Sequence, residues 1–167
     1  LAIGFQANVW NIGAEGQLIM GALAGGGLAL AFYDQGSILL VPAMLICGTL
    51  GGLAWAAIPA WLKTRFNTNE ILTSLMLTYV GLLVLSYLVH GPWKDPEGMN
   101  FPESRMFHDS ALLPVLIEET RLNVGWLLAL LAVAAGWVLI SRHIIGFQIK
   151  VIGIAPLAGT FAGFKEK

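Results

Sequence analysis

The residues of this chain best suited to chemistry are a few polar side chains set in long apolar surroundings. Asn11, Glu15 and Gln17 lie immediately before and within one such apolar stretch. A carboxylate deep in hydrocarbon costs a few kcal/mol, so it normally faces a protein interior or a water-filled cavity. We therefore expect these three side chains to line a polar pathway. Hydrogen bonding between helices and a cap at a helix end are the alternatives.

The backbone around these residues has two interpretations. If the chain is helical from Asn8 onward, Asn8, Asn11 and Glu15 share one face because they are three and four residues apart. Gly13 and Gly16 flank Glu15, so a broken helix with backbone groups facing a cavity is the alternative. Both interpretations place one acid close to several amides.

A second polar group opens another apolar stretch. Asn69 offers a side-chain oxygen to the free N–H groups of a first helical turn, and Glu70 places a negative charge at the positive helix end. Ser74 and Gly81 continue the face of Glu70, with Thr78 nearby. We expect this stripe to point toward neighbouring helices, either as a helix cap or as part of the pathway.

Acids and imidazoles also gather loosely between residues 90 and 123. They lack the fixed spacing of a metal motif, so we expect a solvated loop without a metal site; a membrane enzyme using the two histidines is the remote alternative. The sequence lacks the phosphate-binding G-x-x-x-x-G-K-[ST] loop, H-E-x-x-H and G-x-S-x-G. We therefore expect no catalytic residue and no ATP hydrolysis by this chain. The loop residues are His90, Asp95, Glu97, His108 and Asp109.

The composition predicts which elements position these groups. Hydrophobic residues make up 57% of the 167 residues and charged residues 11%, against about 45–50% and about 25% in soluble domains. A formal net charge of −1 provides no basic field for nucleic acid. So few charges cannot cover a soluble domain of this size, and we predict an all-α polytopic membrane helix bundle in a lipid bilayer.

Four apolar stretches are long enough to cross about 30 Å of hydrocarbon as helices, and they are too long for strands. Residues 1–10 look like the end of a preceding helix. We therefore interpret residues 1–167 as one partial transmembrane domain, a fragment of a longer protein. The four spans are expected at about 12–32, 38–62, 71–89 and 124–140.

Small residues predict how the first two spans pack. Gly21 and Gly25 form a G-x-x-x-G pattern in the first span, and Gly48 and Gly52 form another in the second. Because lipid provides no hydrophobic driving force between helices, small residues that allow close backbone approach are the usual association device. We expect the first two spans to pack tightly.

Basic residues predict the orientation, because Lys and Arg in short loops remain on the cytoplasmic side. The connection 63–70 carries Lys63 and Arg65, and the tail 141–167 carries Arg142 and three lysines. The loop 90–123 instead contains more acids than bases. We expect 63–70 and 141–167 to be cytoplasmic and 90–123 to be external, in a cell (inner or plasma) membrane.

Three motifs follow one another along the chain, which reads NIGAEGQ at 11–17, NEILTSLML at 69–77 and GPWKDP at 91–96. In this order they resemble the permease subunit of ABC importers for nucleosides and simple sugars, in the branched-chain amino acid and ribose-type permease family. GFQIKVIG at 146–153 is similar to the entry to the family's cytoplasmic coupling loop. The family usually continues Asn-Pro-Glu-Ala-Ala-Arg, whereas residues 155–160 read APLAGT.

The resemblance implies a transport subunit that forms part of the pathway for a nucleoside or a simple sugar. It implies partner ABC ATPase subunits, a second permease subunit and an extracytoplasmic substrate-binding protein. ATP and Mg would be bound by the ATPase, so this chain needs no cofactor. An ion- or proton-coupled secondary transporter, with Glu15 as the titrating group, is the alternative. The implied ATPase-coupling residues are Gly146, Phe147, Lys150, Gly153, Pro156, Ala158 and Gly163.

Overall fold

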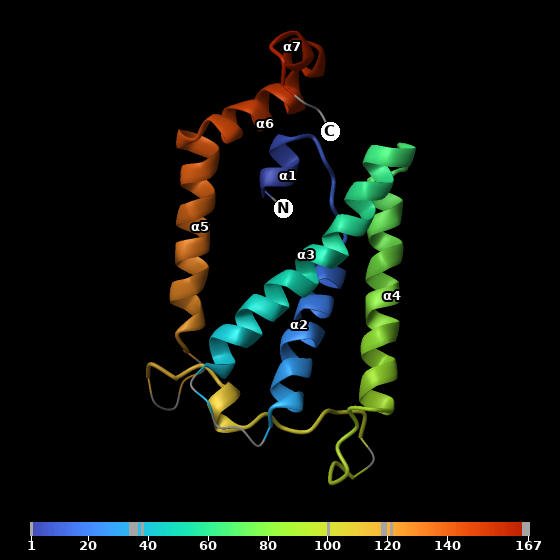
Figure 1. The fold of residues 1–167 in the computed structure, drawn as a ribbon, viewed down its shortest axis with the longest axis vertical. Helices are drawn as coiled ribbons and strands as arrows, with labels where there is room; N and C mark the ends of the chain where they lie inside the picture. The colour runs from blue at the N-terminus through green and yellow to red at the C-terminus, as the bar shows by residue number, and fades with distance from the viewer. Residues whose placement is uncertain are drawn as a thin grey trace. The chain divides into compact units, whose positions relative to one another are not determined.

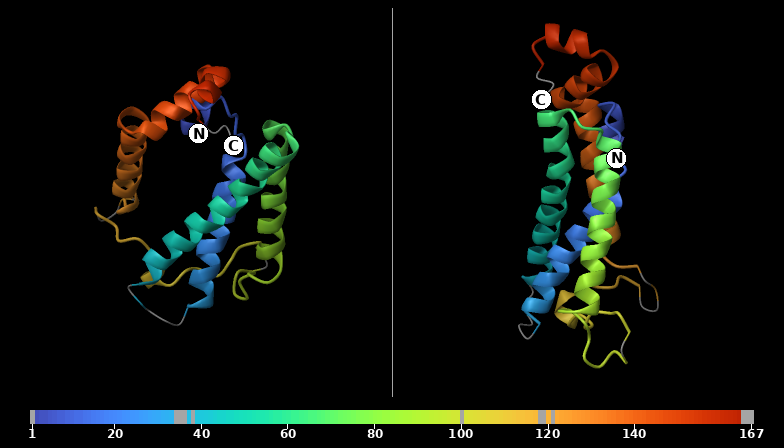
Figure 2. Two further views of the ribbon diagram at one scale, coloured as in Figure 1. Left: turned by 45° about the horizontal axis from the view of Figure 1, so that its top comes forward. Right: turned by 90° about the vertical axis from the view of Figure 1, so that its right-hand side faces the viewer.

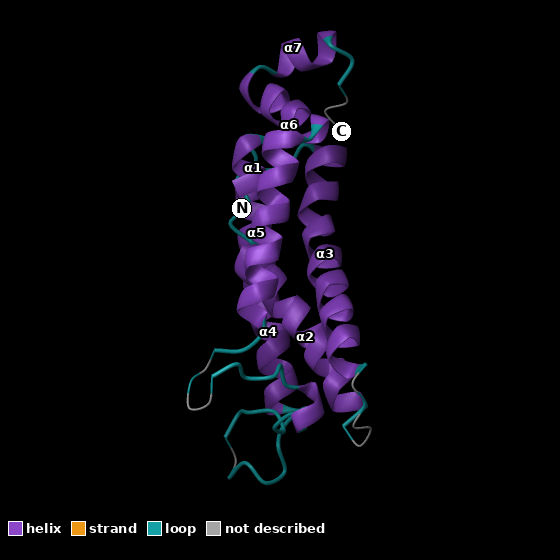
Figure 3. Ribbon diagram, turned by 90° about the vertical axis from the view of Figure 1, so that its left-hand side faces the viewer, coloured by secondary structure: helices purple, strands orange, loops and turns teal. Residues whose placement is uncertain are grey.

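The computed structural model describes residues 2–33, 37, 39–99, 101–117, 120 and 122–164 (Figure 1). Within these ranges the regular elements are helices, joined by loops with isolated β-bridges (Figure 3). Four of the described helices are long and apolar enough to cross a membrane, which confirms the predicted all-α membrane fold. The elements are α1 (Ala2–Gln6), α2 (Ala14–Ala31), α3 (Leu40–Phe66), α4 (Glu70–His90), η1 (Asp109–Ala111), α5 (Gly125–Arg142), α6 (Ile144–Ile154) and α7 (Pro156–Phe161).

The long helices correspond to the expected spans within a few residues, except at the end of α3. The second span was expected to end at residue 62, yet α3 continues to Phe66 and includes Lys63 and Arg65. Cations in a last turn interact favourably with the negative helix end, and their aliphatic stems remain in apolar surroundings, so charge did not end the helix. Ile38, the expected start of this span, lies outside the described residues.

The chain divides into two compact units. The first, residues 12–112, contains α2, α3, α4 and η1. The second is formed by residues 1–11 and 113–167 and contains α1, α5, α6 and α7. Of the basic tail residues, Lys165 and Lys167 lie outside the described residues.

Glycine contacts hold the first unit together. α3 crosses α2 obliquely and α4 runs beside α2 (Figures 1 and 2). A Cβ atom on Gly21 would lie 2.8 Å from the Gly48 carbonyl oxygen, and one on Gly25 would lie 3.0 Å from the Met44 carbonyl oxygen. The two backbones therefore touch where the paired G-x-x-x-G motifs predict close packing, so that prediction is confirmed.

The connection from α3 to α4 is short and well capped. Asn67 takes a left-handed conformation (φ 51°), and its N–H donates to the Lys63 carbonyl at 2.9 Å. Asn tolerates this conformation better than most residues. Asn69 then returns to extended backbone (φ −72°, ψ 112°) and begins α4. The turn therefore sets α3 and α4 antiparallel with only residues 67–69 between them.

In the second unit the chain changes direction after α5. His143 is extended (φ −99°, ψ 148°), so α5 ends at Arg142 and α6 starts in a new direction (Figure 2). The His143 ring atom Nδ1 accepts a hydrogen bond from the Ile145 N–H at 3.2 Å, which caps α6. Pro156 occupies the first turn of α7, where its missing N–H costs no helical hydrogen bond.

Candidate functional site

The polar residues near the N-terminus lie at a break in the helix. α1 ends at Gln6, and Asn8 has a positive φ of 56°. The Asn8 N–H donates to the Phe5 carbonyl at 3.1 Å and the Val9 N–H to the Gly4 carbonyl at 2.9 Å, a pattern that closes a helix C-terminus. The uninterrupted helix that would place Asn8 and Asn11 on one face with Glu15 is therefore wrong, because the chain is interrupted between α1 and α2. That backbone groups of this interruption face a cavity stays a prediction.

The three predicted pathway residues occupy different surroundings. Asn11 is half-buried in the irregular segment before α2, whereas Glu15 is exposed in the first turn of α2 and Gln17 is half-buried in that turn. Gly13 is the N-cap of α2 and has no side chain to cap it. The Glu15 carboxylate thus stands at the positive end of the helix dipole.

The polar face of α4 packs against the start of α2. Ser74 and Thr78 are 2% and 6% exposed, and Gly81 is also buried. A Cβ atom on Gly16 would lie 2.8 Å from the Thr78 Cα atom. The predicted stripe therefore points toward a neighbouring helix, and it meets the short segment that carries Glu15 and Gln17.

The hydroxyl groups on this face are satisfied within α4. The Ser74 hydroxyl donates to the Ile71 carbonyl at 3.2 Å, and the Thr78 hydroxyl donates to the Ser74 carbonyl at 3.1 Å. Hydroxyl groups that bond the preceding turn cost little to bury beside another helix. Ser74 and Thr78 therefore supply a small, polar surface on which α2 can approach closely.

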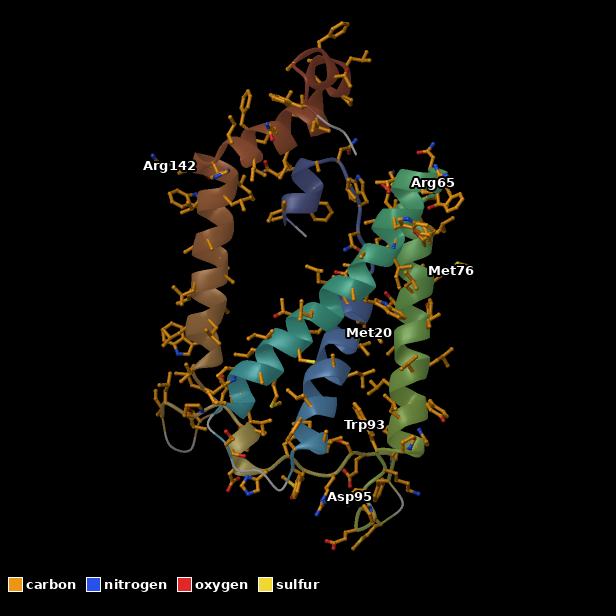
Figure 4. All side chains as sticks on the ribbon, in the orientation of Figure 1. Met20, Arg65, Met76, Trp93, Asp95 and Arg142 are labelled. Carbon is orange, nitrogen blue, oxygen red and sulfur yellow. The ribbon has the colours of Figure 1, made fainter. Side chains whose placement is uncertain are left out.

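The start of α4 is fixed by a cap and an ion pair. The Asn69 Oδ1 atom accepts from the N–H groups of Ile71 and Leu72 at 3.0 and 3.4 Å. The Glu70 carboxylate pairs with the Lys63 ammonium group, and the Glu70 side chain is only 17% exposed. This pair joins the last turn of α3 to the first turn of α4, at the end of the unit where Arg65 also lies (Figure 4).

Two buried polar atoms of this unit were not anticipated from the sequence. The indole nitrogen of Trp55 and the hydroxyl oxygen of Thr68 are buried without a hydrogen-bond partner within the described part of the chain. Trp55 follows Gly48 by seven residues, so it continues the α3 face that packs on α2. The available sequence signal was the seven-residue spacing between Gly48 and Trp55. The apolar composition of the run alone does not show that the indole nitrogen is buried.

The loop after α4 folds against the C-terminal part of α2. A Cβ atom on Gly27 would lie 3.1 Å from the Trp93 ring, and one on Gly26 would lie 3.3 Å from the Phe107 ring. The Arg105 guanidinium group stacks 4.0 Å from the centre of the Tyr33 ring. Trp93 extends from the end of α4 toward α2 (Figure 4). Aromatic side chains thus pack this loop against Gly26 and Gly27 of α2.

The predicted coupling residues form a packed helical pair in the second unit. A Cβ atom on Gly146 would collide with the carbonyl oxygens of Leu139 and Ile140, and one on Gly153 would collide with the Gln6 carbonyl oxygen. The glycines therefore place α6 directly against the end of α5 and against α1. Replacement of either glycine would separate these backbones.

The remaining residues predicted to couple to an ATPase lie on α6, within α7 and just after it. Gly163 has φ +77°, and the Phe164 N–H donates to the Gly159 carbonyl at 2.9 Å, which closes α7 in a Schellman motif. Phe164 then packs edge-to-face on Phe147 with ring centres 6.3 Å apart. Lys150 is half-buried, and Pro156 and Ala158 are exposed.

The structure brings together no cluster of three His, Cys, Asp or Glu side chains suited to a metal ion within the described residues. His90 bonds the Ser86 carbonyl of its own helix at 2.8 Å, and His108 bonds the neighbouring Ser110 hydroxyl at 3.0 Å. These imidazoles therefore make local structural contacts.

Comparisons with known proteins point to one kind of protein. The family described as "Branched-chain amino acid transport system / permease component" matches residues 1–167. The chain is 39% identical over 171 residues to the glucose ABC transporter permease protein TsgB13 of Haloferax volcanii, covering 96% of this chain and 44% of that protein. It is 30% identical over 172 residues to the guanosine ABC transporter permease protein NupP of Bacillus subtilis, covering 100% and 48%.

A third relative is the nucleoside ABC transporter permease protein NupB of Lactococcus lactis, which is 26% identical over 173 residues and covers 99% of this chain and 48% of that protein. The chain thus spans about half the length of these three relatives, between 44% and 48%. No solved structure matches it.

Proposed function

The chain belongs to the family of branched-chain amino acid transport system permease components, and we propose that it forms part of the translocation pathway of an ATP-driven importer. The family match over residues 1–167 carries this proposal, together with four helices able to cross a membrane in a multi-pass protein. The three relatives described above are all ABC transporter permeases, which disfavours an ion- or proton-coupled transporter.

The proposed solute carries a sugar ring, either as a free sugar or within a nucleoside. The named relatives transport glucose, guanosine and nucleosides according to their descriptions, and all of these solutes present ring hydroxyl groups. Carboxylate and amide side chains hydrogen-bond hydroxyl groups well. Asn11, Glu15 and Gln17 supply those groups at the helix break before and within the first turn of α2.

The exposure of Glu15 supports its placement on a pathway. A carboxylate on a membrane-spanning helix is costly against lipid, and Glu15 is exposed on α2. It therefore requires cover from water or from further protein. A solute pathway shared with a second permease subunit would provide both, so we assign Glu15 to the pathway wall.

The charge distribution in the first unit supports the proposed orientation. Lys63 and Arg65 lie at the end where α3 meets α4, and the loop 91–112 at the other end carries Asp95, Glu97 and further acids. Basic loops remain cytoplasmic. We therefore assign the turn 67–69 and the segment after α5 to the cytoplasmic side, with the loop after α4 external.

We assign the ATPase contact to α7 and the end of α6. Ile154, Leu157 and Phe161 are 85%, 77% and 91% exposed on this helical pair. Such side chains outside a span require a partner surface. ATP and Mg²⁺ would be held by that partner ATPase, and an extracytoplasmic binding protein would deliver the solute to the other side.

The close packing of α6 supports a mechanical role for this contact. Gly146 allows α6 to rest directly on the last carbonyl groups of α5, and Phe164 packs on Phe147. Closely packed interiors transmit displacement because they compress little. Movement of an ATPase against α7 would therefore pass through α6 to α5.

Replacement of one exposed aromatic tests this assignment. In the full-length protein expressed with its partner subunits, Phe161→Ser should reduce ATPase copurification and glucose or guanosine uptake by about thirtyfold, because an interface anchor contributes about 2 kcal/mol or more. The matched control is Phe101→Ser, which removes a phenyl ring of 65% exposure from the loop after α4. Copurification and uptake should be unchanged in that control.

The contrary results are specific. Equal losses in both variants would show a general effect on folding and would contradict the assignment. Uptake that continues after ATP depletion and stops when the proton gradient is collapsed would contradict the ABC importer itself.

A further inference from the structure

A cation-lined pocket lies where α5 turns into α6. It is open, has a volume of about 400 Å³, and lies entirely within the second unit. Arg142, His143 and Lys150, together with Ser141, supply its polar lining, and Ile140, Ile144 and Phe147 supply its apolar lining. The pocket thus combines positive charge with apolar surface. This combination suits an amphiphile with a negatively charged headgroup.

The cations of this pocket have no carboxylate counterpart in the described residues of the unit, 2–11, 113–117, 120 and 122–164, which contain no Asp or Glu. The acids of the second unit, Glu118, Glu119 and Glu166, lie outside the described residues. Arg142 extends outward from the end of α5, with its guanidinium carbon 6.0 Å from the Trp137 ring centre (Figure 4). An anion from outside the described chain would complete this arrangement electrostatically.

The start of α6 adds to this positive field. The helix has eleven residues, and its first residue, Ile144, lines the pocket. The N-terminal end of a helix carries a partial positive charge. The His143 ring caps the Ile145 N–H through Nδ1, so the other ring nitrogen remains available as a further polar contact.

The depth of the pocket matches that of lipid headgroups. α5 has 18 residues, which correspond to about 27 Å of helix, close to the hydrocarbon thickness of a bilayer. Arg142 is the last residue of α5, so the pocket lies at the boundary between hydrocarbon and water. Ile144 and Phe147 are 66% and 59% exposed, which leaves apolar surface for acyl chains beside the cations.

We propose that this pocket binds the headgroup phosphate of an anionic phospholipid, with Arg142 and Lys150 as the charge partners. Basic pockets at the ends of membrane helices suit such headgroups. An acidic surface of the partner ATPase is less favoured, because the exposed apolar side chains that suit a protein contact gather at Ile154, Leu157 and Phe161. The proposal does not depend on the transported solute.

The test measures lipid preference of the full-length protein in detergent by native mass spectrometry. Wild type should retain phosphatidylglycerol in preference to phosphatidylcholine. Arg142→Gln should reduce that preference about fivefold, which corresponds to the roughly 1 kcal/mol contributed by one cation near an anionic headgroup. Arg142→Lys should retain most of the preference. The matched control is Arg65→Gln, which removes a guanidinium group from the last turn of α3.

Each contrary outcome overturns the proposal. Wild type without a preference for phosphatidylglycerol would exclude the site, whether or not the variants fold. Equal effects of Arg142→Gln and Arg65→Gln would indicate a nonspecific charge effect. Displacement of the lipid by millimolar inorganic phosphate would assign the pocket to a free anion. If Arg142→Gln lost the copurifying ATPase but kept the lipid preference, the pocket would be assigned to the partner protein.

Discussion

At the scale of single residues, three asparagines of this chain begin or end helices, as their residue type predicts. Asn69 accepts from two N–H groups of the first turn of α4, and Asn8 and Asn67 take the left-handed conformations that end α1 and α3. Asn performs both tasks because its short amide bonds nearby backbone and tolerates positive φ. The three asparagines therefore define where helices begin and end.

The cap at Asn69 is testable on its own. Asn69→Ala should destabilise the first turn of α4 by about 1 kcal/mol, the usual effect of losing an N-cap acceptor. Hydrogen exchange of the Ile71 and Leu72 amides should then rise about fivefold. Asn69→Asp retains an acceptor oxygen and serves as the control. Exchange that rises equally in both variants would contradict the capping role.

At the scale of elements, the helices of the first unit pack at glycines on the faces that are in contact. Gly21 meets Gly48, and Gly16 meets Thr78, at distances that exclude a methyl group without a backbone shift. In lipid, association gains from dispersion contacts and from close backbone approach. α2 thus packs on two partners at once, because glycines occupy both of the faces in contact.

A matched pair of substitutions tests this packing. Gly21→Ala should lower the free energy of unfolding of the full-length protein by about 1–3 kcal/mol, because the new methyl group meets a carbonyl oxygen of α3. Gly136→Ala on α5 should leave stability unchanged or raise it by up to about 1 kcal/mol, because a Cβ atom there has nothing within 4 Å. Thermal unfolding in detergent would compare them, and equal effects would contradict close packing at Gly21.

At the scale of the whole molecule, the chain carries two surfaces that are costly as they stand. The chain spans 44% to 48% of the length of the three relatives described above. Glu15 is exposed on a membrane helix, and exposed apolar side chains extend along α7. Under the proposed function, the pathway should cover the first surface and a partner ATPase the second.

Uptake by Glu15 variants separates the two transport mechanisms. If the carboxylate accepts hydrogen bonds from solute hydroxyl groups, Glu15→Gln should remain within about threefold of wild type, because an amide oxygen still accepts. Glu15→Leu should reduce uptake about tenfold, because a hydrogen bond to a charged group contributes about 1.5–3 kcal/mol. Uptake abolished by Glu15→Gln would instead indicate a titrating carboxylate and contradict the pathway role proposed here.

The sequence by itself determined the helices and their membrane character. Helical hydrogen bonds are local, and crossing hydrocarbon requires about 20 apolar residues, so both features are written in short stretches of sequence. The glycine motifs also predicted that α2 and α3 pack closely, because the spacing that brings glycines to one face is local as well.

Only the tertiary structure decided which of the polar residues meet and where the chain bends. The contact of Gly16 with Thr78 joins residues that lie far apart in the sequence. The break after α1 and the turn at His143 are closed by local hydrogen bonds that the sequence patterns did not identify. The sequence patterns left both a continuous helix and a broken helix open around Asn11, because an apolar segment is compatible with either. The packing of α2 on α4 and of α6 on α5 selects one arrangement through contacts that no single segment contains.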